Sequence, residues 1–304
     1  MTIGIPKSLL YHRYNTLWES FFEYLDIDTI TSPSTNKEIL EEGIKYANDE
    51  ACLSLKIYLG HIKYLANKCD YILIPRIESL KKYEKLCTNF MALYDIVENT
   101  FNVKILNYNI DVTHNYDELY AFITIAKELG VKRNKAIKAY KYAKEQESIE
   151  ENSKIIKQES KLKTENIKIL IAGHSYNLYD ELVGVPITKY LTENNIEVIY
   201  SDICKKNYTD FSPNIISKEI YWTYNKEIFS SINHYLNSVD GIILVSTFPC
   251  GPDSLCNEII VRKIKNKPII TIIVDELNND SGLITRLESF IEILKERRKM
   301  LYNE

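Results

Sequence analysis

The chain has 304 residues, of which 45% are hydrophobic and 26% are charged, a composition typical of a globular protein long enough for two domains. Its formal net charge of −4 argues against a general nucleic-acid-binding protein, because neutralising phosphates requires a concentrated basic surface. The sequence has no apolar run of the roughly 20 residues that a membrane span requires and no signal-peptide pattern at its N-terminus. We therefore expect a cytoplasmic protein with neither nucleic-acid nor membrane partners.

The first half of the chain alternates predicted strands with predicted helices. Short apolar runs ended by turn residues predict strands at residues 3–5, 28–31, 71–74 and 103–108. Apolar residues at helical spacing predict helices at residues 9–25, 35–47, 51–67 and 89–101. This alternation favours a parallel sheet with crossover helices.

A charged helical segment at residues 116–165 follows, and then the alternation starts again. The second set of predicted strands covers residues 167–172, 197–200, 241–246 and 269–274, and the helices between and after them cover 178–193, 215–236, 252–265 and 283–299. The predicted fold class is α/β, with two Rossmann-like (flavodoxin-like) parallel-sheet domains, residues 1–115 and 166–304, that face each other across a cleft. In such sheets ligands bind beyond the carboxyl ends of the strands.

Nucleotide binding by the standard glycine-rich devices is not expected. The nine glycines include no G-x-G, so the sequence has neither a dinucleotide fingerprint nor a P-loop. The chemistry of the chain must therefore be sought in other residues.

Cys250 lies where a predicted buried strand ends and a helix begins. Gly251 allows a tight turn there, and Pro252 suits a first helical position because its missing N–H would be unpaired. A thiol near the positive end of a helix dipole is favoured as a thiolate, the form that binds metals. Cys87 occupies the equivalent place after the third predicted strand of the first half, and Cys52 lies at the predicted start of helix 51–67.

Six cysteines in a cytoplasmic protein favour metal binding or catalysis over disulfide bonds. Thiols from three separate loops, Cys52, Cys87 and Cys250, suit a 4Fe–4S cluster in which one iron lacks a cysteine ligand. The alternative is that each cysteine is a small buried apolar residue. Cys256 is either a fourth ligand or structural. We interpret the remaining two cysteines, Cys69 and Cys204, as structural.

Polar residues also follow the predicted strand 167–172. His174, Tyr176, Asn177 and Asp180 are expected to crowd the cleft, where they could donate a proton or hydrogen bonds. The alternative is that Asn177 caps a helix and Tyr176 packs in the core. Arg286, in the first turn of the last predicted helix, is expected to point inward toward an anionic partner.

Several segments resemble a known family, the acyl-CoA dehydratase activase-related domain, which belongs with the iron–sulfur subunits of 2-hydroxyacyl-CoA dehydratases and benzoyl-CoA reductases. The resemblance covers nearly the whole chain in the right order. The matching segments are Ile3-Gly-Ile-Pro6, Asn48-Asp-Glu-Ala-Cys52, Ile74-Pro-Arg76, Cys87 with its helix, Gly173-His-Ser-Tyr-Asn177, Cys250-Gly-Pro-Asp-Ser254, and Asp275-Glu with Gly282-Leu-Ile-Thr-Arg-Leu-Glu288.

The resemblance implies that Cys52, Cys87 and Cys250 hold a 4Fe–4S cluster between two α/β domains. It further implies that the chain accepts low-potential electrons from an ATP-dependent activase on a separate chain, because the nucleotide-binding motifs of an activase are absent here. The chain would then reduce or dehydrate a small substrate, such as an acyl-CoA, as a dehydratase-like lyase or as a component of an ATP-driven reductase. The alternative is a non-catalytic cluster carrier, or an activase-associated electron-transfer protein. Both readings are compatible with a homo- or heterodimer.

Overall fold

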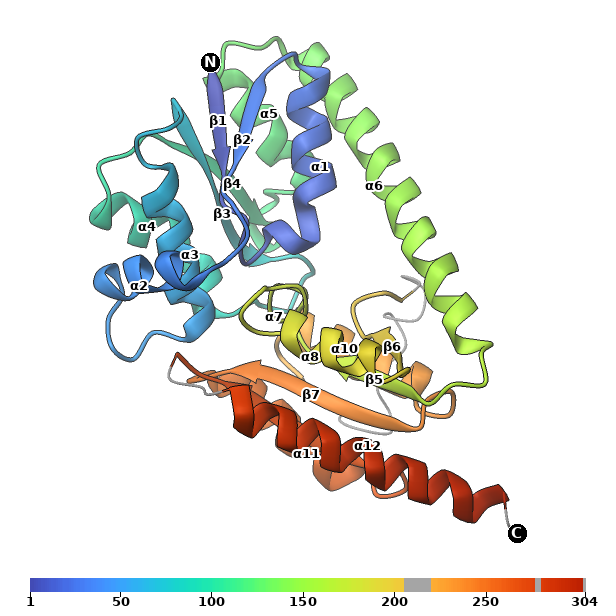
Figure 1. The fold of residues 1–304 in the computed structure, drawn as a ribbon. Helices are drawn as coiled ribbons and strands as arrows, with labels where there is room; N and C mark the ends of the chain where they lie inside the picture. The colour runs from blue at the N-terminus through green and yellow to red at the C-terminus, as the bar shows by residue number, and fades with distance from the viewer. Residues whose placement is uncertain (205–219, 277–279, 303–304) are drawn as a thin grey trace. The chain divides into compact units, whose positions relative to one another are not determined.

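The computed structural model describes residues 1–204, 220–276 and 280–302. They form an α/β protein, and the strands among them make two four-stranded parallel sheets, as the alternation of elements predicted (Figure 1). The chain divides into two compact units. Unit 1 is Met1–Asn152 with Tyr221–Thr223, and unit 2 is Ser153–Ile220 with Tyr224–Glu304.

The sheet of unit 1 has the strand order β2-β1-β3-β4. Every neighbouring pair is parallel. The chain moves outward in one direction from β1 to β2 and in the other from β3 to β4, so the switch point lies between β1 and β3. The strands are β1 (Thr2–Ile5), β2 (Asp28–Thr31), β3 (Tyr71–Ser79) and β4 (Ile105–Asp111). Consecutive residues Ile72, Leu73 and Ile74 of β3 are all buried, as expected for a central strand covered on both faces.

Helices cover both faces of this sheet, with α1 and α5 on one side and α3 and α4 on the other (Figure 1). The helices that begin in unit 1 are α1 (Tyr11–Tyr24), α2 (Lys37–Tyr46), α3 (Leu53–Leu65), α4 (Thr88–Thr100), α5 (Glu118–Glu128) and α6 (Arg133–Leu162), and a short 3-10 helix, η1, covers Val112–His114. The core on the α1 side is aromatic. The ring of Tyr108 in β4 lies 5.5 Å from that of Trp18 in α1 and 5.2 Å from that of Phe122 in α5.

Helices α2 and α3 cross with their backbones in close contact, because each has a glycine at the crossing. A Cβ atom on Gly43 would lie 1.8 Å from the carbonyl oxygen of Lys56. A Cβ atom on Gly60 would lie 1.9 Å from the carbonyl oxygen of Ile39. Any larger residue at either position must therefore push the two helices apart.

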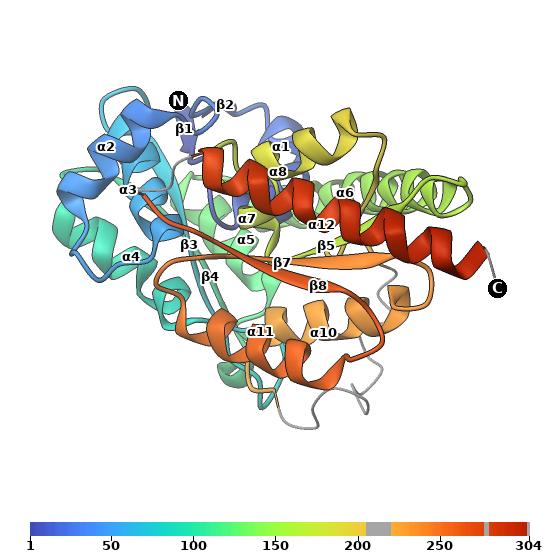
Figure 2. The ribbon, with the colours of Figure 1, turned by 60° about the horizontal axis from the view of Figure 1, so that its bottom comes forward.

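The sheet of unit 2 repeats the strand order of unit 1, as β6-β5-β7-β8, again with parallel neighbours. The strands are β5 (Lys168–Ala172), β6 (Glu197–Tyr200), β7 (Gly241–Thr247) and β8 (Ile269–Val274). The helices are α7 (Ser175–Leu178), α8 (Val185–Glu193), α10 (Thr223–Tyr235), α11 (Gly251–Lys263) and α12 (Asp280–Tyr302). Figure 2 shows α8 and α12 on one side of β7 and β8, and α10 and α11 on the other.

The predicted helix 178–193 differs from the structure, which has two helices, α7 and α8, separated by a turn. Asp180 holds this turn, because its side chain accepts a hydrogen bond from the backbone N–H of Leu182 at 2.8 Å. Gly184 follows where a Cβ atom would lie 2.2 Å from the carbonyl oxygen of Leu178. The first part of the predicted helix 215–236 falls outside the described residues. Among the described helices, none has both the length and the apolar composition of a membrane span.

Candidate functional site

Three cysteines each occupy the N-cap position of a helix, the residue just before its first turn. Cys52 precedes α3, Cys87 precedes α4 and Cys250 precedes α11. All three are half-buried, and none of the six cysteines, all of which lie in the described part of the chain, forms a disulfide. The positive end of each helix dipole therefore lies next to a thiol and favours its thiolate form.

In unit 1, Cys52 lies beside the start of α4. The side-chain amide of Asn89, two residues after Cys87, donates a hydrogen bond to the Cys52 sulfur, with an Nδ2–Sγ distance of 3.7 Å. Lys56, one turn further along α3 than Cys52, is 7% exposed, and its ammonium group donates to the carbonyl oxygen of Asp49 at 3.1 Å. Two thiols thus share one region of unit 1, and a buried positive charge lies one helical turn from the first of them.

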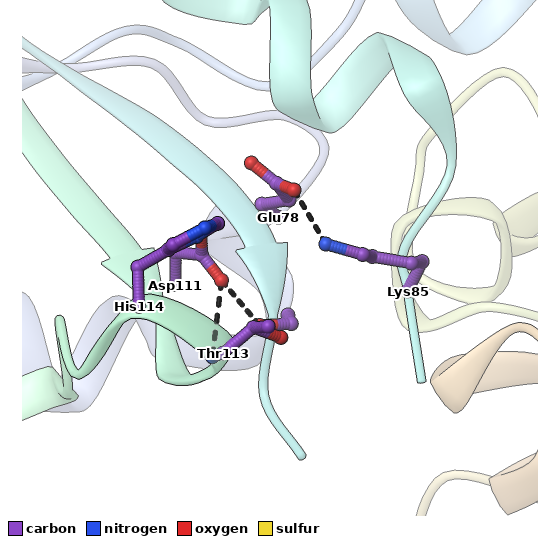
Figure 3. A network of polar contacts seen from close by, with 6 residues as sticks. Glu78, Lys85, Asp111, Thr113 and His114 are labelled. Atoms are coloured by element: carbon purple, nitrogen blue, oxygen red, sulfur yellow. Dashed lines mark hydrogen bonds and ion pairs between the residues drawn. The ribbon is translucent and has the colours of Figure 1, made fainter. Parts of the chain in front are cut away.

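The loop that carries Cys87 is held against the end of β3. Lys85 forms an ion pair with Glu78, and Figure 3 shows this pair. The backbone of Lys85 also pairs with the segment Tyr221–Thr223, since its N–H donates to the Tyr221 carbonyl oxygen at 3.2 Å and its carbonyl oxygen accepts from the Thr223 N–H at 3.1 Å. These contacts fix the path of the chain into Cys87.

The carboxyl ends of β3 and β4 are joined by a second set of polar contacts around Asp111 (Figure 3). The Asp111 carboxylate accepts hydrogen bonds from the Ser79 hydroxyl at 2.6 Å and from the Thr113 N–H at 3.1 Å, and its other oxygen contacts the His114 imidazole. Burial raises the pKa of Asp111, but the hydrogen bonds from Ser79 and His114 outweigh burial and lower it. Since the hydroxyl donates to the carboxylate and not to the imidazole, this group is not a Ser–His–Asp triad. The hydrogen bonds of Asp111 connect the carboxyl ends of β3 and β4.

In unit 2, Cys250 and His174 meet at one buried carboxylate. Asp253 is 4% exposed, and its Oδ1 atom lies 2.8 Å from His174 Nε2 and 2.9 Å from Asn225 Nδ2. Burial raises the pKa of Asp253, but the charge and hydrogen bond of His174, with hydrogen bonds from Asn225 and Cys250, lower it overall. The structure therefore brings two of the predicted site residues together through a third residue that was not predicted.

The other residues predicted near His174 have different surroundings. The ring of Tyr176 stacks on the His174 ring with centroids 4.9 Å apart, and Asn177 is fully buried. Asp180 is buried in the turn that it holds between α7 and α8. Arg286, expected to point inward, is exposed, and its guanidinium donates to the carbonyl oxygen of Thr271 in β8.

Sequence reasoning missed Asp253, Asn225 and Asn89. Asp253 is the third residue of α11, where a carboxylate is ordinarily explained by the helix dipole. Asn225 and Asn89 lie near helix starts, where asparagine is also common. The available signal was the polar character of the first helical turn, which does not reveal the partner of a side chain.

The remaining cysteines differ from the three at N-cap positions. Cys256 is 3% exposed, and burial, together with the charge of Asp253, raises its pKa to about 12. Cys69 donates to the carbonyl oxygen of Leu65 at 3.4 Å, and burial raises its pKa. Among the described residues, no three His, Cys, Asp or Glu side chains form a group that could hold a metal ion. Cys52 and Cys87 could supply two thiolate ligands to a cluster, and such a cluster would need at least one further ligand.

Comparison with known proteins identifies the family. No curated protein is significantly similar to the chain. One solved structure with detectable similarity is the C-terminal domain of glucosamine-fructose-6-phosphate aminotransferase from Francisella tularensis, with 10% identity, a TM-score of 0.24, and coverage of 97% of this chain and 84% of that chain. A similarity at that TM-score carries no argument about fold or function.

The family model described as "CoA enzyme activase uncharacterised domain (DUF2229)" matches residues 2–204. The match includes Cys52, Cys87 and His174 and ends before Cys250, and it covers more than half of the chain. It confirms the activase-related resemblance that the sequence motifs indicated. The chain therefore belongs to this family of CoA enzyme activase domains.

Proposed function

We propose that the chain is an iron–sulfur redox protein that binds a 4Fe–4S cluster through Cys52, Cys87 and Cys250. The observation that best supports the proposal is the position of these three cysteines, because each is the N-cap residue of a helix. Cys52 and the helix start at Cys87 are also in direct contact through Asn89. When bound, a 4Fe–4S cluster would supply one-electron transfer at low potential.

The electrostatics of the three sites support thiolate ligands. A cluster with three thiolates is anionic overall, and helix N-termini offset the cost of burying negative charge. Lys56 adds a buried positive charge one turn from Cys52. The raised pKa of Cys256 disfavours its thiolate, so its role as a fourth ligand stays a prediction.

We further propose that the electrons come from an ATP-dependent activase on a separate chain and reduce or dehydrate a small substrate of the acyl-CoA class. Membership of a CoA enzyme activase family supports an activase partner and a CoA-linked reaction. In this proposal His174 is the proton donor, and the 2.8 Å contact between its Nε2 atom and Asp253 Oδ1 fixes the position of its ring. The catalytic roles of Tyr176, Asn177, Asp180 and Arg286 stay predictions.

A second candidate is a non-catalytic protein that carries electrons or clusters for an activase. Membership of a family of CoA enzyme activase domains, rather than of CoA enzymes themselves, supports this alternative. It requires the same three cysteines but no substrate site.

Anaerobic iron and sulfide analysis tests the proposal. The wild-type chain should hold four irons and four sulfides, and Cys52→Ser, Cys87→Ser and Cys250→Ser should each lose most of them. Cys69→Ser and Cys204→Ser are matched controls that should keep the cluster. Loss of iron in the controls to the same extent, or an iron-free wild type, would contradict the proposal.

A second assay separates the two candidates. The reconstituted chain is mixed with an activase, ATP and a set of acyl-CoA and 2-hydroxyacyl-CoA thioesters, and both cluster reduction and substrate conversion are followed. ATP-dependent reduction with turnover of a thioester supports the enzyme. Reduction without turnover of any thioester supports the carrier.

A further inference from the structure

The turn between β1 and α1 of unit 1, residues 6–10, contains buried hydrogen-bond donors that the described residues do not pair. Ser8 is 4% exposed, and its hydroxyl makes no hydrogen bond with any described residue. Leu9 and Leu10 are also buried, and their backbone N–H groups have no acceptor in the described part of the chain. Buried donors are normally paired in folded proteins, so three of them in one turn point to an acceptor that the chain itself does not supply.

The backbone conformation of this turn is one that holds anions. Leu9 has a φ of 48°, in the left-handed region that residues other than glycine rarely adopt, and Leu10 is right-handed helical. Turns of this kind direct successive N–H groups to one side and form a concave anion site. The N–H groups of the first turn of α1 are already used, because Tyr11 donates to the Ser8 carbonyl oxygen at 3.1 Å and His12 to that of Leu9 at 3.4 Å. The unused donors therefore belong to the turn and not to the helix end.

Lys7 adds a positive charge to the same turn. It is half-buried, its ammonium group donates to the Ser34 hydroxyl at 3.0 Å, and among the described residues no carboxylate pairs with it. Burial, and then the charge of Lys7, lowers the pKa of His12 to about 4. Burial, and then the charges of His12 and Lys7, lowers the pKa of His61 to about 3. The charges that act on both imidazoles are positive, which favours an anionic ligand in this region.

The turn also lies where open α/β sheets bind ligands. It follows the carboxyl end of β1, next to the switch point between β1 and β3, and the first strand-to-helix turn is where such sheets hold phosphate groups. The turn lacks the glycines of the usual phosphate-binding loops, but Leu9 adopts the left-handed conformation for which glycine is usually required.

We propose that the β1–α1 turn of unit 1 binds a phosphate group through the Lys7 ammonium, the Ser8 hydroxyl and the backbone N–H groups of Leu9 and Leu10. A phosphate group has three terminal oxygens and close to two negative charges at neutral pH, so it accepts hydrogen bonds from more donors than a carboxylate does.

Isothermal titration calorimetry of the full-length chain with inorganic phosphate, in a chloride buffer, tests this site. Lys7→Met removes the ammonium group and keeps the apolar stem, so phosphate affinity should fall by about tenfold or more. Lys37→Met is the matched control, because it removes the same charge from unit 1 at a side chain that is 84% exposed. It should keep the wild-type affinity. Absence of saturable binding to the wild type, or equal affinity in Lys7→Met, overturns the proposal.

Nuclear magnetic resonance of the chain labelled with 15N-leucine locates the bound ion without any change of charge. The amide signals of Leu9 and Leu10 are identified by their loss in Leu9→Met and Leu10→Met. Both signals should move downfield as phosphate is added, because each N–H gains an acceptor. Saturable phosphate binding that leaves both signals in place overturns the proposal, and this readout decides the question if Lys7→Met does not fold.

A parallel titration with coenzyme A distinguishes the two sources of a phosphate group. Tighter binding of coenzyme A than of inorganic phosphate, weakened in Lys7→Met, assigns the site to a phosphate group on a larger molecule. Binding of coenzyme A that is no tighter assigns it to the free ion. The turn contains no cysteine and needs no cluster, so an iron-free wild type that binds phosphate at Leu9 and Leu10 supports this site and contradicts only the proposed function.

Discussion

Replacement of Gly43 by alanine should destabilise unit 1, because it separates the helix pair that places Cys52. The new Cβ atom would lie 1.8 Å from the carbonyl oxygen of Lys56, a backbone atom that cannot move without its helix. Overpacking of this kind costs about 1–3 kcal/mol. Alanine regains about 1 kcal/mol over glycine in a helix. Subtracting this gain from the largest overpacking cost gives an expected net loss of about 2 kcal/mol in the free energy of unfolding.

Tryptophan fluorescence during urea unfolding measures this loss in unit 1 alone, because both tryptophans of the chain, Trp18 and Trp222, belong to that unit. Gly282→Ala in α12 is the control, since a Cβ atom there meets nothing within 4 Å. It should leave the tryptophan transition unchanged. An unchanged or higher midpoint for Gly43→Ala would refute the close crossing of α2 and α3.

The double variant Gly43→Ala with Gly60→Ala gives a sharper form of the same test. Both new Cβ atoms push the same two helices apart, and a Cβ atom on Gly43 would lie only 2.8 Å from the backbone nitrogen of Gly60. Once the helices have separated for one substitution, the second costs less. The loss in the double variant should therefore be smaller than the sum of the two single losses, whereas strict additivity would indicate two independent sites.

Three further predictions concern buried groups. Burial lowers the pKa of His61 from 6.5 in the unfolded chain to about 3 in the folded chain. Below pH 6.5 the unfolded chain therefore binds a proton at His61 that the folded chain does not bind. The His61 contribution to stability should fall by about 2 kcal/mol toward pH 5. His61→Gln should remove this part of the pH dependence in tryptophan-detected urea titrations and leave the part due to His12, whose pKa burial lowers to about 4. Asp253→Asn should lower the free energy of unfolding by about 3 kcal/mol, measured by thermal unfolding followed by circular dichroism. Asp202→Asn is the control and should lower it much less, because the hydrogen bond from Tyr179 to Asp202 lies at the surface. Cys256, with a pKa of about 12, should resist iodoacetamide at pH 8 while Cys250 reacts, and equal rates by peptide mass mapping would contradict its burial.

The two sheets could be predicted from the sequence because their central strands are continuous apolar runs. Ile72, Leu73 and Ile74 in β3 and every residue of β7 are buried, so short apolar stretches ended by turn residues marked them clearly. The N-cap positions of Cys87 and Cys250 were predictable for a similar local reason, since Thr88 and Pro252 signal helix starts. The domain boundaries at residues 115 and 165, and the cleft between the domains, stay predictions.

The contacts that build the candidate site could not be predicted, because each joins residues far apart in the chain. Nothing near His174 in the sequence points to Asp253, 79 residues away, and nothing near Cys52 points to Asn89, 37 residues away. The break between α7 and α8 depends on the space around Gly184, which helical periodicity does not reveal. Arg286 was expected to point inward because a buried arginine needs an anion, but the long side chain instead lies exposed and donates to a strand carbonyl.

Native mass spectrometry of the anaerobically purified chain tests the central claim most directly, because it counts clusters on each molecule. The account predicts that the wild type carries the added mass of one 4Fe–4S cluster and that a variant with serine at positions 52, 87 and 250 carries none. A wild type at its bare protein mass, or a triple variant that keeps the cluster mass, would contradict it.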